Sequence, residues 1–253
     1  MVNIVVENME KSSLFWRTYP TVFKGVFRLI FGKNWWRNPS VHKMKKVLTL
    51  PRDRFFSYYV RDIGRGFVQS KLPDGVIVQP SDSLLENYDI YRSNIFETYY
   101  EIKSDDVVVD VGAHVGIFTL KAARKARNGL VVAVEPHVPN YKLLTHNINN
   151  NEMKNVLTLN VALSDFTGTT KLCISDDSLS HTIDGKRIEL ENFRKKRYAK
   201  IKVLTLDELI DKLELRSVNF IKINVEGAEL SVLKGAEKSL EKNDVTLAIA
   251  ADH

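Results

Sequence analysis

The sequence predicts an α/β protein in which a mostly parallel, doubly wound sheet is covered by helices on both faces. Residues 107–111 have the sequence Val-Val-Val-Asp-Val, enter a turn that contains Gly112 and Gly116, and continue with helical spacing. Residues 130–134 form a second apolar run of strand length. From there to the C-terminus, strand-like runs alternate with helical patterns, which is the arrangement typical of this fold class.

Length and composition indicate one main domain. The chain has 253 residues, of which 44% are hydrophobic and 27% charged, as in an ordinary globular protein. We divide it into a basic, aromatic-rich extension at residues 1–80 and a main domain at residues 81–253. The single cysteine, Cys173, allows no internal disulfide, and neither a signal peptide nor a membrane-spanning run is visible. We therefore expect a cytoplasmic location.

Positive charge is concentrated near the N-terminus. Residues 1–66 contain 13 Lys and Arg against 4 Asp and Glu, together with all three tryptophans. Residues 21–31 predict a short amphipathic helix with Lys24 and Arg28 on its polar side. Such a helix either packs on the main domain or docks peripherally on a membrane through residues 14–36, and we favour the first alternative.

The remaining elements follow from turn signals and periodicity. β-rich runs at residues 66–72 and 76–79 flank the turn at Pro73 to Gly75, which predicts a hairpin. Residues 81–104 predict a helix that leads to the glycine turn. In the main domain we predict strands at 107–111, 130–134, 156–162, 169–174, 200–204, 218–224 and 245–251, and helices at 139–151, 206–211 and 229–242.

The glycine turn and two acidic strand ends predict a nucleotide-like ligand. Glycines let a backbone approach a ligand closely, and the N–H groups of the following helix favour an anionic or strongly polar group. The turn lacks the second and third glycines of the Gly-x-Gly-x-x-Gly pattern, which disfavours NAD. Asp110 suits a ligand that carries an ammonium group, and Glu135 ends the next strand, where such folds hold ribose hydroxyls. These features favour S-adenosylmethionine.

Several ordered motifs resemble a known family. They are Asp110 to Gly116, the pair Glu135-Pro136, residues 160–165, residues 224–229 and residues 232–236. In this order they resemble the FkbM-type S-adenosylmethionine-dependent methyltransferases, from about residue 90 to the C-terminus. The resemblance implies a class I (Rossmann-like) methyltransferase fold. It also implies methyl transfer, typically to a hydroxyl oxygen of a sugar or secondary metabolite.

The resemblance also implies a cofactor site. We place it at Asp110, Gly112, Ala113, His114, Gly116, Phe118, Glu135, Pro136, Val161, Ala162 and Asn224. The chain departs from the family at two of these positions, because His114 stands where Asn is usual and Asn224 where Asp is usual. No clustered ligand set indicates a metal. A class I methyltransferase usually ends with two more strands, so we expect a truncated chain, or a homo-oligomer that covers the strand at 245–251.

Two residues are candidates for the chemistry of methyl transfer. The reaction requires alignment of a nucleophile with the methyl carbon and removal of a proton from a hydroxyl acceptor. Glu226, just after the fourth strand, could position or deprotonate the acceptor, or it could be a carboxylate stabilised by a helix N-terminus. His181 lies in a polar loop and titrates in the useful range, and the alternative is a solvent-exposed loop histidine.

Three functions compete at this level. The leading hypothesis is O-methylation of a glycan, glycolipid or related metabolite. RNA methylation is its nearest rival, because positive charge gathers at the N-terminus and at residues 194–197. Residues 224–227 do not form the Asn/Asp-Pro-Pro-aromatic motif common in amino-group methylation of bases, so we rank a nucleic-acid partner lower. A non-catalytic cofactor-binding or membrane-associated module is the third alternative, suggested by Asn224 and by the missing strands.

Overall fold

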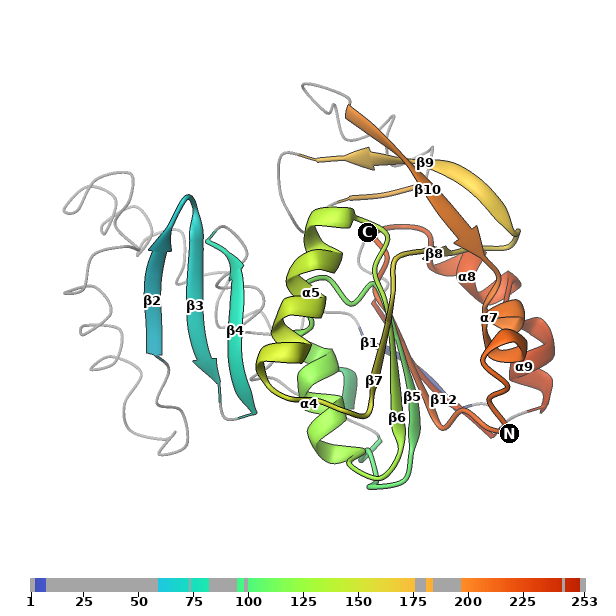
Figure 1. Ribbon diagram of the computed structural model, residues 1–253. Coiled ribbons are helices and arrows are strands. Elements are labelled where there is room, and N and C mark those ends of the chain that lie inside the picture. The colour runs from blue at the N-terminus through green and yellow to red at the C-terminus, as the bar shows by residue number, and fades with distance from the viewer. Residues whose placement is uncertain are drawn as a thin grey trace.

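A six-stranded parallel sheet, in the order β1-β12-β11-β5-β6-β7, forms the centre of the molecule (Figure 1). The computed structural model describes residues 3–7, 59–72, 74–81, 95–97, 100–175, 181–183, 197–242 and 244–250. The predicted amphipathic helix at 21–31, the predicted membrane contact at 14–36 and the basic residues 194–196 lie outside these ranges. Two three-stranded sheets accompany the central sheet.

Five of the six strands of the central sheet are those that the apolar runs predict. They are β5 (Val107–Val111), β6 (Leu130–Val134), β7 (Val156–Leu159), β11 (Phe220–Ile223) and β12 (Thr246–Ala250). Each pairs in parallel with its neighbours, so the prediction of a doubly wound parallel sheet is confirmed. The runs are almost continuously apolar because helices cover both faces. The third strand is shorter than predicted, because the chain leaves this sheet after Leu159.

The last strand is not an edge of the sheet. Strand β1 (Asn3–Glu7) pairs in parallel with β12, from Asn3 opposite Thr246 to Glu7 opposite Ala250. The expectation that the strand at 245–251 lacks a neighbour was therefore wrong. Its partner comes from the opposite end of the chain, so β12 needs no second copy to cover it. The domain boundary near residue 80 stays a prediction.

Helices pack on both faces of the central sheet (Figure 1). Helices α4 (Ile117–Lys125) and α5 (Val138–Asn150) cover one face, while α7 (Leu206–Lys212), α8 (Glu229–Lys234) and α9 (Glu237–Lys242) cover the other. Alternate residues of the strands pack into two hydrophobic cores, one on each face of the sheet. Val109 packs toward α7 to α9, and Val108 packs toward α4. None of the helices described is long and apolar enough to cross a membrane.

The helix predicted at 229–242 is two helices. It breaks at Gly235, where an added Cβ would lie 2.0 Å from the carbonyl oxygen of Ser164. The carboxylate of Asp207 then accepts hydrogen bonds from the backbone N–H groups of Lys238 (3.1 Å) and Ser239 (2.8 Å). A residue of α7 thus caps the start of α9, which local periodicity does not reveal.

The helix predicted at 81–104 does not form over the part of it that the structure describes. Residues 95–97 form a short 3-10 helix, η2 (Ile95–Glu97), and residues 100–103 are not helical. The buried carboxylate of Glu97 instead forms ion pairs with Lys121 (2.9 Å) and Lys125 (3.4 Å). These ion pairs connect η2 to α4.

The predicted hairpin is confirmed and has a third strand. Strands β2 (Tyr59–Gly64), β3 (Phe67–Leu72) and β4 (Gly75–Pro80) form an antiparallel sheet beside α5 (Figure 1).

Asn147 of α5 and Asn151, the residue that caps the C-terminal end of α5, bind the outer edge of β4. Asn147 accepts from Val78 N (2.8 Å) and donates to Val78 O (2.9 Å), and Asn151 makes the same pair of bonds with Val76 (2.8 and 2.6 Å). Asn147 also donates to the carbonyl of Val115 in the glycine turn, at 2.8 Å. Asn147 therefore bonds both to the small sheet and to that turn.

A third sheet lies over the carboxyl ends of the central strands (Figure 1). It contains β8 (Ala162–Leu163), β10 (Arg197–Leu204) and β9 (Gly168–Ile174), in that order. Both additional strands expected from the sequence are thereby confirmed, and β10 starts earlier than predicted. Thr182 joins the sheet through a backbone bridge to Cys173.

Candidate active site

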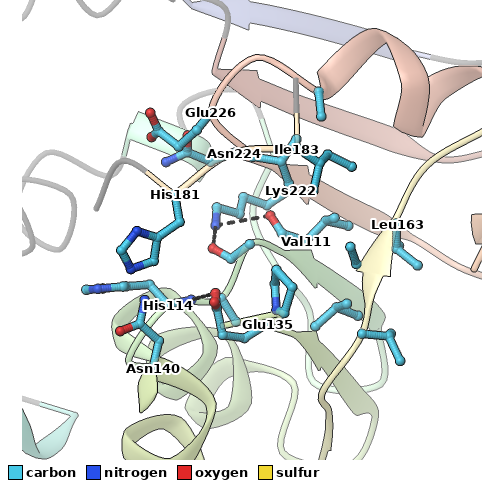
Figure 2. Close-up of a pocket in the computed structure, with 18 of the residues that line it drawn as sticks. Val111, His114, Glu135, Asn140, Leu163, His181, Ile183, Lys222, Asn224 and Glu226 are labelled. Atoms are coloured by element: carbon cyan, nitrogen blue, oxygen red, sulfur yellow. Dashed lines mark hydrogen bonds between the residues drawn. The ribbon is translucent and has the colours of Figure 1, made fainter. Parts of the chain in front are cut away.

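One pocket opens at the carboxyl ends of β5, β6 and β11 and gathers most of the predicted residues (Figure 2). Ligands bind at this end of open parallel sheets. The predicted residues that line it are Gly112, Ala113, His114, Phe118, Glu135, Pro136, Val161, Ala162, His181, Asn224 and Glu226. Asp110 and Gly116 do not line it. Phe96, Asn140 and Lys222 line it although the sequence analysis did not select them.

The glycines of the turn are required by the protein's own packing. Gly112 and Gly116 have φ angles of 78° and 91°, a region that favours glycine. A Cβ at Gly112 would lie 2.0 Å from the carbonyl oxygen of Asn224, and one at Gly116 would lie 2.6 Å from the side chain of Leu144. The sequence predicts that these glycines allow close approach of a ligand. In the structure they allow close approach of the loop after β11 and of α5.

Glu135 is held at the tip of β6 by two backbone amides. Its oxygens accept hydrogen bonds from the N–H groups of His114 and His137, each at 2.9 Å. His114 adopts a left-handed backbone with φ 52°, which directs its N–H to this carboxylate. Burial raises the pKa of Glu135 to about 7, although both hydrogen bonds and Lys222 act in the opposite direction. The carboxylate therefore has a fixed position in the pocket wall.

Asp110 lies behind the pocket and is paired with Lys222. These residues are opposite each other on β5 and β11, and Lys222 Nζ lies 2.9 Å from Asp110 Oδ1. The other oxygen, Oδ2, accepts from the hydroxyl of Thr119 at 2.6 Å. Both carboxylate oxygens of Asp110 are thus engaged within the protein. A direct contact between Asp110 and the ammonium group of a ligand stays a prediction.

Among the residues that the structure describes, Lys222 is the one Lys or Arg that lines the pocket. Its ammonium donates to the carbonyl of Gly112 at 2.7 Å and lies 5.4 Å from the centre of the Phe96 ring. The sequence contained a signal for it, because Lys222 and Asp110 are each the one charged residue in an otherwise apolar strand. A buried charge requires a partner, so two such residues of opposite sign predict a pair. Phe96 and Asn140 carried no comparable signal.

The loop after β11 brings Asn224 and Glu226 to the pocket. Asn224 Oδ1 is buried and accepts no hydrogen bond from the part of the chain that the structure describes. Glu226 has a left-handed backbone with φ 58°, and its carbonyl accepts from the hydroxyl of Thr182 at 2.7 Å. Glu229 caps this loop by accepting from the N–H groups of Val225 (3.0 Å) and Gly227 (3.3 Å).

His181 lies in the pocket wall and is not an exposed loop residue. Its Nδ1 accepts from the N–H of Ser175 at 3.2 Å, and its ring packs edge-on against His137 with the centroids 4.0 Å apart. Burial, followed by His137 and Arg197, lowers the pKa of His181 to about 4. The ring is consequently neutral near pH 7. Figure 2 shows it between Glu226 and Asn224 on one side and His114 and Asn140 on the other.

The described residues contain no group of three or more His, Cys, Asp or Glu side chains that could hold a metal ion.

The sheet order, the glycine turn after β5, the acidic tip of β6 and the pocket across their ends define a class I, Rossmann-like methyltransferase domain. The Methyltransferase FkbM domain family matches residues 110–253, and the chain belongs to this family. Family membership identifies S-adenosylmethionine as the cofactor.

Relatives are found in an archaeon and in fungi. The chain is 30% identical over 141 residues to the hexuronic acid methyltransferase AglP of Haloferax volcanii, a match that covers 56% of this chain and 54% of AglP. It is 29% identical over 184 residues to the methyltransferase sdnD of Sordaria araneosa, covering 62% and 71%. The match thus spans about half the length of AglP.

A solved structure of a methyltransferase from Aquifex aeolicus is 18% identical to this chain. It covers 66% of this chain and 71% of its own, with a TM-score of 0.37.

Proposed function

We propose that this domain transfers the methyl group of S-adenosylmethionine to a hydroxyl oxygen of a glycan, glycolipid or related metabolite. The family supports methyl transfer, and the hexuronic acid methyltransferase among the relatives supports a sugar acceptor. The observation that carries the proposal is the pocket itself, because the glycine turn, the Glu135 carboxylate and the loop after β11 all border one cavity.

The pocket has groups suited to both ends of this cofactor. Glu135 can accept hydrogen bonds from ribose hydroxyls, while Val161 and Ala162 offer an apolar wall to the base. The buried acceptor Asn224 Oδ1 suits the ammonium group of the methionine end. When bound, the cofactor supplies an electrophilic methyl group on a sulfonium. The protein then has to orient the acceptor hydroxyl in line with that group and accept its proton.

Glu226 is the residue that we propose for positioning or deprotonating the acceptor. It lines the pocket, and the hydrogen bond from Thr182 to its carbonyl fixes its backbone. Glu226→Gln should lower kcat by about 100-fold or more, the usual contribution of a positioned acid or base, and should leave cofactor affinity within about two-fold. Turnover is measured with methyl-labelled cofactor, and affinity by titration calorimetry.

Glu214→Gln is the matched control for this change. Glu214 has a similar left-handed backbone, with φ 52°, but is exposed in the turn after α7 and does not line the pocket. The control should retain wild-type turnover. Undiminished turnover of Glu226→Gln, with cofactor bound, would remove Glu226 from the reaction.

The acceptor class is tested with the same label. The 253-residue chain and methyl-labelled cofactor are incubated with cell extract, which is then fractionated into glycan, lipid and RNA. Label in glycan or lipid supports the proposal. Label in RNA favours the RNA methyltransferase alternative, and cofactor binding with no transfer favours a non-catalytic module.

The raised pKa of Glu135 predicts pH-dependent cofactor binding. Burial makes the protonated form the preferred one, so this group stabilises the fold fully below its ordinary pKa of 4.5 and loses that contribution as pH rises through about 7. Ribose hydroxyls would donate to the ionised form. Affinity for the demethylated cofactor S-adenosylhomocysteine should therefore rise by up to about ten-fold between about pH 6 and about pH 8.

Calorimetric titration across this pH range measures the effect, with Glu135→Gln as the comparison. The glutamine variant keeps the side-chain shape but has no charge to titrate, so its weaker binding should not change with pH over this interval. An equal pH dependence in both proteins would assign the titration to another group.

A further inference from the structure

Residues 181–183 form a strap at the pocket wall, which His181 and Ile183 line, and the strap is fixed on both sides. Toward β9, Cys173 and Thr182 exchange backbone hydrogen bonds of 2.9 and 3.2 Å. Toward β11, the hydroxyl of Thr182 donates to the carbonyl of Glu226 at 2.7 Å. The strap therefore holds His181 at a defined place over the cavity, where its side chain forms part of the wall.

The protonation of the His181 ring follows from its hydrogen bond to Ser175. The N–H of Ser175 donates to Nδ1 at 3.2 Å, so Nδ1 is an acceptor. A neutral imidazole carries one proton, and here that proton is on Nε2. Nε2 is buried and makes no hydrogen bond with any residue that the structure describes. A buried donor without a partner is costly, which indicates that a ligand supplies the acceptor.

The position of the ring indicates which part of a ligand it meets. His181 packs against His137, which comes two residues after Glu135 and whose N–H bonds the Glu135 carboxylate. His181 is thus joined through His137 to the segment that begins with Glu135 at the tip of β6, and both His181 and Glu135 line the cavity. This tip is where a fold of this kind holds the ribose and base of a nucleotide-like cofactor.

We propose that His181 binds the nucleoside end of S-adenosylmethionine as a neutral hydrogen-bond donor through Nε2–H, and that it is not the base of the reaction. The identity of this ligand rests on the proposed function. The acceptor atom is an oxygen of the ribose or a nitrogen of the adenine. The strap is thereby a fixed part of the wall around the bound nucleoside.

The same geometry argues against His181 as a general base. Accepting a proton requires a free lone pair, but the lone pair of Nδ1 is engaged by Ser175 and Nε2 carries the hydrogen. Burial and the neighbouring His137 and Arg197 also lower the pKa of the ring to about 4, which makes it a weak base near neutral pH. The deprotonation role is left to Glu226.

Calorimetric titration of the full chain with two probes tests the proposal. S-adenosylhomocysteine has both the nucleoside and the amino-acid ends, whereas 5′-methylthioadenosine has the nucleoside end alone. His181→Phe keeps a ring but has no donor, and it should weaken the binding of both probes by about five- to ten-fold. His181→Gln is the matched variant, because its amide can place an N–H near the position of Nε2, and it should stay within about two-fold of wild type.

Nitrogen-15 NMR of histidine-labelled wild-type protein gives an independent measurement. The proposal expects the Nε2–H tautomer of His181 with and without S-adenosylhomocysteine, and a change in the Nε2–H resonance when the probe binds. This readout does not depend on the folding of any variant.

Four outcomes would overturn the proposal. They are wild-type affinity in a His181→Phe protein that melts like wild type, weaker binding of S-adenosylhomocysteine but not of 5′-methylthioadenosine, an Nδ1–H tautomer, and a charged ring near pH 7. A folded wild-type protein that binds neither probe would instead refute the proposed function, and this inference with it.

Discussion

Replacing Lys222 by methionine is expected to lower the free energy of unfolding by about 3–5 kcal/mol, the usual effect of removing one partner of a buried ion pair. The ammonium lies 2.9 Å from Asp110, and the two side chains are 5% and 0% exposed. Without Lys222, the hydrogen bond from Thr119 is the one that the Asp110 carboxylate keeps among the residues that the structure describes. Urea denaturation followed by circular dichroism measures the loss.

The double variant Asp110→Asn with Lys222→Met is the control for this prediction. It removes both charges while keeping side chains of similar size, so it should recover most of the stability that the single variant loses. A double variant as unstable as the sum of the two single variants would show that the charges do not stabilise each other. Because Lys222 also bonds the carbonyl of Gly112, the double variant should fold but bind the cofactor more weakly.

Gly112→Ala is expected to abolish measurable cofactor binding, a loss of about 100-fold or more, because the turn that borders the pocket cannot keep its position. The added Cβ would lie 2.0 Å from the carbonyl oxygen of Asn224, and φ is 78°. Either the turn or the loop after β11 must move, and both border the pocket. Calorimetry with S-adenosylhomocysteine measures binding, and thermal unfolding measures stability.

Gly66→Ala separates the two causes of this loss. Gly66 has nearly the same backbone, with φ 82°, but a Cβ there would meet nothing within 4 Å. The control therefore carries only the backbone penalty of a left-handed alanine, about 1–2 kcal/mol, and should keep full cofactor affinity. If both variants lose the same stability and both still bind, the contact with Asn224 is not what requires glycine at position 112.

The central strands were predictable because their information is local. A buried parallel strand is a short apolar run. The runs that end before Gly112 and Glu135 are separated from each other by turn and helix signals. The same patterns located most of the pocket, since the carboxyl ends of parallel strands meet at one edge of the sheet. Family resemblance added the loop after β11, with Asn224 and Glu226.

The remaining features depend on contacts between distant segments. β1 pairs with β12 across almost the whole chain, so no window of sequence contains both partners. The break at Gly235 depends on the carbonyl of Ser164, and the cap of α9 depends on Asp207. His181 was selected because histidine titrates near neutral pH, whereas its surroundings keep the ring uncharged. The pKa of a side chain depends on its burial and on nearby charged groups, and the positions of these groups cannot be read from the sequence.

The side chains of Asn147 and Asn151 take the place of a further strand beside β4 in the small sheet. Their amide oxygens accept from the N–H groups of β4 and their amide N–H groups donate to its carbonyls, as a neighbouring strand would, so this edge is closed to strands of other molecules. Asn147 also donates a hydrogen bond to the carbonyl of Val115, which connects this contact to the glycine turn. A cut near residue 80 would therefore remove a sheet that is linked through Asn147 to the glycine turn, and not only a separate extension.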